Sequence, residues 1–235
     1  KFRDLMLDYI SKNTKSPRVA EAFGNLGWYY RQSDQIDMAR DTYWRAITEH
    51  GNDPEICSVD DLFPALARLY RTPEEVLQYE ARLGDMATEA KTSKKTTQLM
   101  RILYAQSRSL LKTAPEQSHA LLLEAFQYAD VKTTSPVLLV DFANALIESG
   151  QEKIGEELLR DTLRWNPRAM QKDRILSSLG DMELRHGKEK KALEFYARFE
   201  KETLGSAIFG ETMLKQARLL KKRGNTAETL RVLEA

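Results

Sequence analysis

The sequence predicts an all-α fold, a solenoid of antiparallel helix pairs, and two observations carry this prediction. Apolar residues recur at positions i, i+3, i+4 and i+7 over most of the 235 residues, which is the spacing of an amphipathic helix, and no stretch alternates as a strand does. Gly150, Gly187 and Gly224 each lie between two such helices, with a constant spacing of 37 residues. A fixed period of this length, built from two helices, is typical of a solenoid in which each pair covers the apolar face of the next.

The helix boundaries follow from start and stop signals. Ser16-Pro17, Thr72-Pro73 and Ser135-Pro136 each place a hydroxyl at the N-cap and a proline at the first helical position, and Thr72 with Glu75 fits a capping box. The three spaced glycines can adopt the left-handed conformation that ends a helix. We therefore predict a single domain of residues 1–235, with a leading helix and about six pairs, at 2–12, 17–33/35–50, 58–71/73–90, 95–113/115–130, 136–149/151–165, 170–186/188–203 and 206–223/225–235.

Composition limits the classes of function. The chain is 42% hydrophobic, which suits a folded core, and its 36 Lys and Arg nearly balance its 35 Asp and Glu, for a net charge of +1. A dedicated nucleic-acid binder usually carries a basic excess, so this balance argues against that class. No apolar run approaches the roughly 18 residues that span a bilayer. Lys1 is not a methionine, the leading helix has no partner before it, and the last helix stops at Ala235 without a polar cap. We therefore expect the repeats to continue in a longer protein.

The sequence contains no motif for catalysis, a cofactor or a metal. Glycine loops that bind phosphates or dinucleotides are missing, as is an H-E-x-x-H pair. The single cysteine excludes an internal disulfide. The nearest approach to a reactive cluster is His50, Asp53 and Cys57, which we interpret as a histidine near a helix end, a turn aspartate and a half-buried thiol. We expect no enzymatic activity, no cofactor and no metal.

A repeat signature occupies residues 23–54. Aromatic, leucine and glycine residues stand at spaced positions of its first helix, and small and aromatic residues follow in its second, at Phe23, Leu26, Gly27, Tyr30, Ala39, Tyr43 and Ala46. This pattern resembles the tetratricopeptide repeat (TPR), with only the closing proline displaced, to Pro54. The resemblance implies a right-handed superhelix of helix pairs whose concave face binds peptides or partner proteins.

Later repeats match the family less completely. In the fourth predicted pair Gly155 stands where alanine is usual, and Asn166-Pro167 closes the repeat. In the fifth pair Glu183 stands where an aromatic residue is expected. The stretch 56–130 is helical but irregular, so the resemblance is clear over roughly half of the chain.

Most aromatic rings of the first repeat are expected in packing. The space between the paired helices is assigned to Phe23, Tyr30 and Tyr43. Contacts between successive repeats, or the outer face, are assigned to Tyr29 and Trp44. Trp28 points away from Tyr30 on the helix, and the family register turns it, with Arg31, toward the concave groove. It is either an anchor for a partner peptide, since Trp is favoured at binding hot spots, or a contact with a neighbouring repeat or the leading helix.

Basic residues gather in the last repeats. The family register places on the concave face Arg174, Arg185, Arg218, Lys221 and Lys222. They form either a basic groove for an acidic segment or ordinary cations that complement helix C-termini. Asn144 is suited to pair with a peptide backbone through its amide. The lysine and asparagine of the family's chaperone-type clamp are not in place, so we expect no binding to a chaperone tail.

The resemblance therefore implies a non-catalytic interaction scaffold that binds a peptide or a partner protein in its groove, with acidic partners favoured. The candidate partner-binding residues are Trp28, Arg31, Asn144, Arg174, Arg185, Arg218, Lys221 and Lys222. Two alternatives stay open. One is an RNA-processing scaffold of the half-a-TPR type, because the residues from Ala39 to Ala46 also fit that repeat. The other is a regulatory segment of a larger enzyme.

Overall fold

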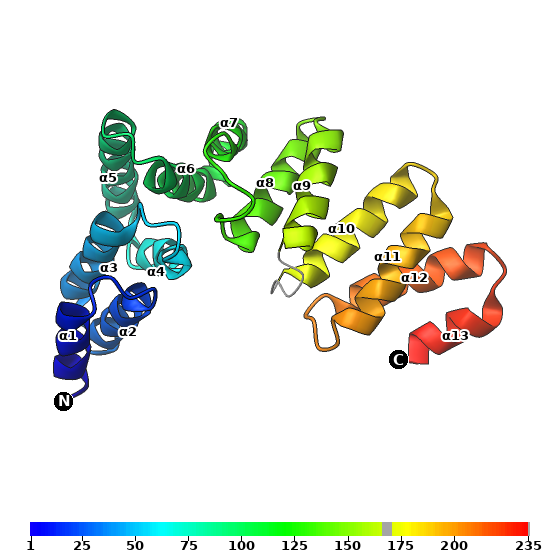
Figure 1. Cartoon of the computed structure of the whole chain (residues 1–235), viewed down its shortest axis with the longest axis horizontal. Helices are drawn as coiled ribbons and strands as arrows, with labels where there is room; N and C mark the ends of the chain where they lie inside the picture. The colour runs from blue at the N-terminus through cyan, green and yellow to red at the C-terminus, as the bar shows by residue number, and fades with distance from the viewer. Residues whose placement is uncertain (166–170, 235) are drawn as a thin grey trace. The chain divides into compact units, whose positions relative to one another are not determined.

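The computed structural model of the chain describes residues 1–165 and 171–234 and divides into two compact units, 1–135 and 136–235. Among the described residues there are thirteen α-helices, one 3₁₀ helix and no strand (Figure 1). The predicted all-α class is thereby confirmed.

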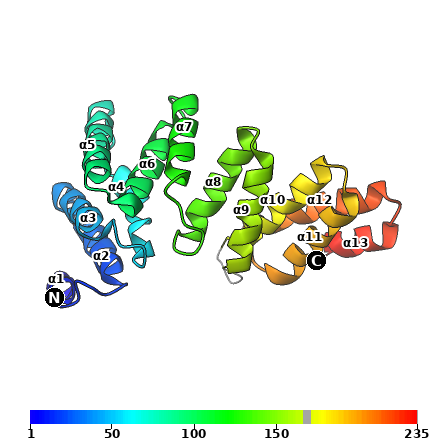
Figure 2. The same cartoon turned by 45° about the horizontal axis from the view of Figure 1, so that its top comes forward.

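The first unit contains the leading helix and the irregular repeats. Its elements are α1 (Phe2–Lys12), α2 (Val19–Gln32), α3 (Ile36–His50), the 3₁₀ helix η1 (Cys57–Val59), α4 (Leu62–Ala67), α5 (Pro73–Thr92), α6 (Thr96–Leu110) and α7 (Pro115–Phe126). Helices α2 and α3 pack as a pair, as do α6 and α7 (Figure 2). The prediction of a pair from 58–71 and 73–90 is wrong, because α4 packs mainly against α3 and α6 while α5 packs against α6.

Proline shortens the predicted helix 58–71. Pro64 has no amide hydrogen, and its ring clashes with the carbonyl four residues before it, so an α-helix accepts it only in the first turn. Helix α4 accordingly begins at Leu62, and the residues before it form η1 and a turn. Pro73 in turn holds Thr72 in an extended conformation, with φ −90° and ψ 157°, which separates α4 from α5.

The capping box at the start of α5 forms as predicted and also joins α5 to α3. The hydroxyl of Thr72 accepts the Glu75 amide at 3.2 Å, and the Glu75 carboxylate accepts the amides of Thr72 at 3.1 Å and Arg71 at 2.8 Å. Arg40 of α3 pairs with the same carboxylate and donates to the carbonyl of Leu69 at 2.6 Å. The Arg40 guanidinium and the two amides hold the pKa of Glu75 at about 2.

A buried arginine organises the turn between α3 and α4. Arg101 of α6 is 3% exposed, and its guanidinium donates to the Asp60 carboxylate at 2.7 Å. It also donates to the carbonyls of Gly51 at 2.8 Å, Asp53 at 3.0 Å and Ile56 at 3.1 Å. The planar group thus satisfies three backbone acceptors and one charge at once, which fixes this loop against α6.

The second unit consists of three helix pairs. Its helices are α8 (Pro136–Glu148), α9 (Glu152–Trp165), α10 (Lys172–Arg185), α11 (Glu189–Glu202), α12 (Phe209–Lys222) and α13 (Thr226–Glu234). Gly150, Gly187 and Gly224 end the first helix of each pair with φ of +82°, +72° and +74°, as predicted. The predicted closing dipeptide Asn166-Pro167, the start of predicted helix 170–186 and Ala235 lie outside the described residues.

Two hydroxyl residues at predicted helix starts form a turn before the helix instead. The hydroxyl of Ser16 accepts the Arg18 amide at 3.2 Å, so α2 begins at Val19 rather than at residue 17. The hydroxyl of Ser206 accepts the Ile208 amide at 3.2 Å, and α12 begins three residues later than predicted, at Phe209. Local side-chain bonds of this kind compete with the first helical turn.

A glycine sets the distance between paired helices in both units. A Cβ atom added at Gly27 of α2 would lie 2.5 Å from the ring of Tyr43 on α3, and one at Gly180 of α10 would lie 2.5 Å from the ring of Tyr196 on α11. Real Cβ atoms do not approach a ring so closely. The close approach predicted at Gly27 is therefore present, and it recurs in the second unit.

Substitution of Gly27 by alanine should lower the free energy of unfolding by about 1–3 kcal/mol, because the new methyl group overpacks against Tyr43. Gly84→Ala is a matched control in α5, where an added Cβ would have its nearest neighbour at 4.0 Å. Alanine at this site should instead stabilise the chain by up to about 1 kcal/mol, since glycine is a poor helix former. Urea denaturation of both variants measures the two effects, and equal shifts of the same sign would contradict the packing described here.

The Glu75 carboxylate predicts a pH dependence. Its pKa of about 2 in the folded chain lies below its ordinary value of 4.5, so its stabilising contribution is present above pH 4.5 and is lost as the pH falls toward 2. Glu75→Gln keeps a capping side chain but removes the charge. The difference in unfolding free energy between wild type and Glu75→Gln should be constant above about pH 5 and shrink between about pH 4.5 and 2. Denaturation curves at several pH values measure it; a difference that grows on acidification would refute this role.

Candidate functional site

The first helices of successive pairs in the second unit lie side by side. Arg174 of α10 pairs with Asp141 of α8 at 3.0 Å, and Lys215 of α12 pairs with Asp181 of α10 at 2.8 Å. Each contact joins a first helix to the next first helix, so these ion pairs mark a surface that runs across α8, α10 and α12. We call this surface the first-helix face.

Several predicted groove cations are engaged by acidic side chains. Arg185 pairs with Glu152 at 3.0 Å, and Lys222 pairs with Glu189 at 2.7 Å. Both members of the second pair follow those of the first by the same 37 residues that separate the glycines, so this is one contact repeated along the solenoid. The cation in each case holds the pKa of its glutamate below the ordinary value. The ion pairs of Arg185, Lys222 and Arg174 reduce the net positive charge predicted for the groove.

Two predicted cations remain open. Arg218 and Lys221 on α12 are exposed, and within residues 1–165 and 171–234 neither side chain has an ion-pair or hydrogen-bond partner. Asn144 on α8 is half-buried and occupies the position that Asp181 has on α10 and Arg218 has on α12. The first-helix face therefore carries an amide, an acid and a base at the same repeat position, and its unpaired positive charge is confined to α12.

The carboxylates that pair with these cations are not among the predicted site residues, although the sequence carries a signal for two of them. Asp141 and Glu152 each precede their arginine by 33 residues, which is slightly less than one repeat. Glu183, placed where the family has an aromatic residue, is 2% exposed. Arg160 of α9 pairs with it at 2.9 Å, so an ion pair between repeats replaces the missing ring.

In the first unit, Trp28 is the most exposed of the predicted packing or binding rings. Its side chain is 53% exposed, and Arg31, one turn further along α2, is half-buried. Gly24, one turn earlier, lies against α4, since an added Cβ would be 3.4 Å from Leu62. Trp28 therefore lies on the side of α2 that carries Gly24, with much of its indole open to solvent.

Two other rings join successive helices, which is one of the two placements expected for them. Trp44 is 1% exposed; its indole N–H donates to the hydroxyl of Tyr70 at 2.8 Å, and its ring lies 5.7 Å from that of Tyr79 on α5. Tyr29 lies 5.7 Å from Phe2 on the leading helix. These rings pack between elements of the first unit.

The cluster of His50, Asp53 and Cys57 has no features of an activated nucleophile. Burial lowers the pKa of the His50 imidazole, which packs 5.7 Å from the ring of Phe23. Burial and the Asp60 carboxylate raise the pKa of the Cys57 thiol, the opposite of what a reactive thiolate requires. No described group of three or more His, Cys, Asp or Glu side chains is arranged to hold a metal ion. Of the helices that the structure describes, none has the length and apolar character needed to cross a bilayer.

No protein-family model and no curated protein matches the sequence. Solved structures share its fold. A chain of the APC/C hetero-tetramer Cut9–Hcn1 matches with a TM-score of 0.53 at 10% identity, over 99% of this chain and 42% of that one. The RpL4 assembly chaperone Acl4 (residues 1–338) matches with a TM-score of 0.44 at 18% identity, over 97% of this chain and 99% of that one. A putative kinesin light chain of Podosopora anserina with TPR-like repeats matches with a TM-score of 0.37 at 16% identity, over 94% of each chain.

This chain thus spans less than half the length of the Cut9–Hcn1 chain that it matches. At this level of identity the likeness concerns the fold alone. The structure is a helical-repeat fold of the TPR type, and the sequence-based prediction of that fold is confirmed.

The two tryptophans of the first repeat should respond very differently to truncation. Trp44→Ala removes a buried ring and should cost about 3–5 kcal/mol of unfolding free energy. Trp28→Ala should cost less than about 1 kcal/mol, because much of the indole already contacts water. Chemical denaturation of the two variants measures these values. A large loss for Trp28→Ala would mean that this ring is a packing residue.

Proposed function

We propose that this chain, whose fold is that of a TPR-type solenoid, is a non-catalytic scaffold that binds a peptide or a partner protein. The observation that carries the proposal is the first-helix face, where three helices from successive pairs are joined by contacts between their side chains. Solenoids use such extended surfaces to bind partners, and each added pair lengthens the surface.

The chemistry of the face favours acidic partners at α12. Arg218 and Lys221 are exposed and unpaired among the described residues, whereas Arg174, Arg185 and Lys222 already have carboxylate partners. An acidic segment would supply the missing charge, and exposed charges are screened over about 8–10 Å near physiological ionic strength. Association should therefore weaken as salt is added.

In the first unit, Trp28 and Arg31 form a second proposed contact area, in which an exposed indole lies one turn from a half-buried arginine. Trp and Arg are enriched among the residues that dominate binding energy. Asn144 on α8 would add a donor and an acceptor for a peptide backbone. We thus propose one contact area within each unit.

The test is affinity enrichment from cell extract with the whole chain as bait, at low and at high salt. The variant Arg218→Glu/Lys221→Glu should retain far less of each salt-sensitive partner than wild type. The control Lys153→Glu/Lys201→Glu changes the same charge at two exposed lysines of the second helices α9 and α11, which also have no ion pairs among the described residues. This control should retain partners as wild type does.

Equal retention by all three proteins would place binding away from α12. Partners that disappear after nuclease treatment would favour the RNA-processing alternative instead. Turnover by the purified chain of a substrate class found in the enriched fraction would contradict a non-catalytic role. Thermal denaturation monitored by circular dichroism checks that the variants stay folded.

A further inference from the structure

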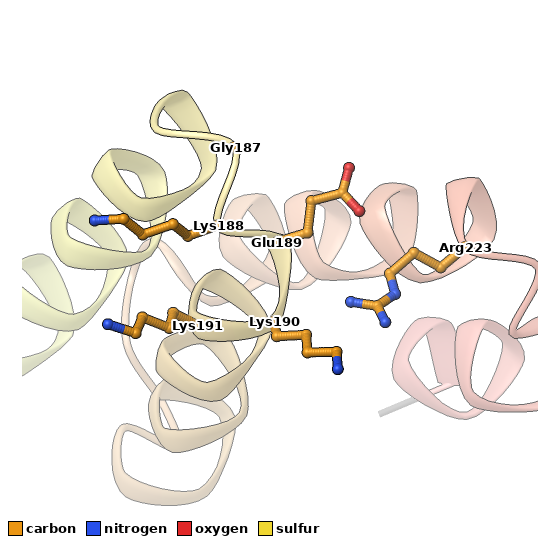
Figure 3. A pocket seen from close by; sticks show the side chains of 6 residues that line it. All are labelled: Gly187, Lys188, Glu189, Lys190, Lys191 and Arg223. Carbon is orange, nitrogen blue, oxygen red and sulfur yellow. The ribbon is translucent and has the colours of Figure 1, made fainter.

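A hollow lined by basic side chains opens at one end of the helix pairs in the second unit. Its lining residues come from the turn between α10 and α11, the first turn of α11 and the end of α12, and they are Gly187, Lys188, Glu189, Lys190, Lys191 and Arg223 (Figure 3). We call it the basic hollow. Figure 3 shows Lys190 and Arg223 reaching toward the same space from two different helices, while Lys188 and Lys191 point the other way. None of these residues belongs to the groove predicted from the sequence.

The charges of the basic hollow are not balanced within the described chain. The only carboxylate among its lining residues, that of Glu189, accepts a hydrogen bond from the Lys222 ammonium group at 2.7 Å. The ammonium group of Lys188 forms an ion pair with the Glu183 carboxylate at 3.4 Å. The remaining cations, Lys190, Lys191 and Arg223, are exposed and have no ion pair or side-chain hydrogen bond among the described residues. Lys190 and Arg223 therefore reach toward one small region, and Glu189, the carboxylate that lines it, is already paired with Lys222.

Helix energetics do not account for two of these cations. Lys190 and Lys191 stand in the first turn of α11, where the positive end of the helix dipole disfavours a positive side chain. The N-cap residue Lys188 has no acceptor atom in its side chain and makes no capping hydrogen bond, so its side chain does not compete with an anion for the amides of the first turn. An anion in the hollow would satisfy those donors and the unpaired cations together.

We propose that the basic hollow binds an acidic segment of a partner protein, a short run of Asp or Glu side chains. The inference rests on the proposed function as a protein-binding scaffold and adds a class of partner and a place for it off the first-helix face. A nucleic-acid strand fits less well, because the lining has no aromatic side chain on which a base could stack and contains a carboxylate.

The test measures binding of a fluorescein-labelled hexaglutamate peptide to the whole chain by fluorescence anisotropy at low salt, with hexaglutamine as the uncharged comparison. Three variants are compared: Lys190→Gln/Lys191→Gln/Arg223→Gln in the hollow, Arg218→Gln/Lys221→Gln on the first-helix face, and the control Arg164→Gln/Arg198→Gln/Lys201→Gln. The control removes three other positive charges near the C-terminal ends of α9 and α11, where Arg164 pairs with Asp161 and Arg198 with Glu202. Circular dichroism melting curves check that each variant folds.

The hollow variant should raise the Kd for hexaglutamate by about tenfold or more, and the control should stay within about twofold of wild type. Because Arg218 and Lys221 are themselves proposed to attract acidic partners, Arg218→Gln/Lys221→Gln should weaken binding too, but less than the hollow variant does. Three outcomes would overturn the proposed binding site: no binding to wild type, equal weakening in all variants, or a loss of binding confined to Arg218→Gln/Lys221→Gln. A single-stranded oligonucleotide that binds more tightly than hexaglutamate and depends on the same three cations would also overturn it, by making the hollow a nucleic-acid site. The proposed scaffold function fails separately, when the enrichment experiment retains no partner.

Discussion

The contact between a glycine and a tyrosine ring inside a helix pair is the constraint on which much of this structure depends. At Gly180 the ring of Tyr196 occupies the space that any side chain would fill. The hydroxyl of the same tyrosine donates to Asp181 at 2.6 Å, and Asp181 also receives Lys215 of the following pair at 2.8 Å. The ring that fixes the distance within one pair therefore also places the acid that holds the next pair. A longer side chain at Gly180 would disturb both levels of packing.

The two units join their successive helices by different means. In the first unit the contacts centre on buried side chains. Trp44 packs on Tyr79, with Arg82 4.5 Å over the Trp44 ring, and Arg101 fixes a loop from within the core. In the second unit many contacts between pairs are ion pairs at the surface, which contribute little stability each, about 0–1 kcal/mol. Such pairs orient neighbouring helices and use up charge that the sequence alone presents as free.

Several parts of the fold could be predicted because their signals are local. The glycines at 150, 187 and 224 mark helix ends, and Thr72 and Glu75 mark a helix start. The repeat pattern pairs Gly27 with Tyr43, whose ring packs against the glycine. The short α4 could not be predicted from apolar periodicity, which continues through Pro64, although the proline itself was a signal. The role of Arg101 could not be predicted either, because its partners lie 41 to 50 residues earlier in the chain.

The candidate site shows the same division. The register of the first repeat predicted that Trp28 and Tyr30 face different ways, and the structure has one exposed and the other buried. The sequence predicted Arg174, Arg185 and Lys222 as groove cations but did not predict their ion pairs. An ion pair between repeats depends on how neighbouring helices are offset along their axes. The basic hollow could not be predicted because its cations come from the start of one helix and the end of another, and only the packing of the two helices brings them together.

The order of the contacts has a mechanical consequence for the second unit. Its main packing runs from each helix to the one that follows it, from α8 through to α13. A pulling force on the two ends of this unit would thus pass through the interfaces in series, and the weakest interface would open before the others bear a breaking load. Extension would then proceed as successive small ruptures, one helix pair at a time. In a β-sheet pulled along its strands, by contrast, many hydrogen bonds would bear the load together.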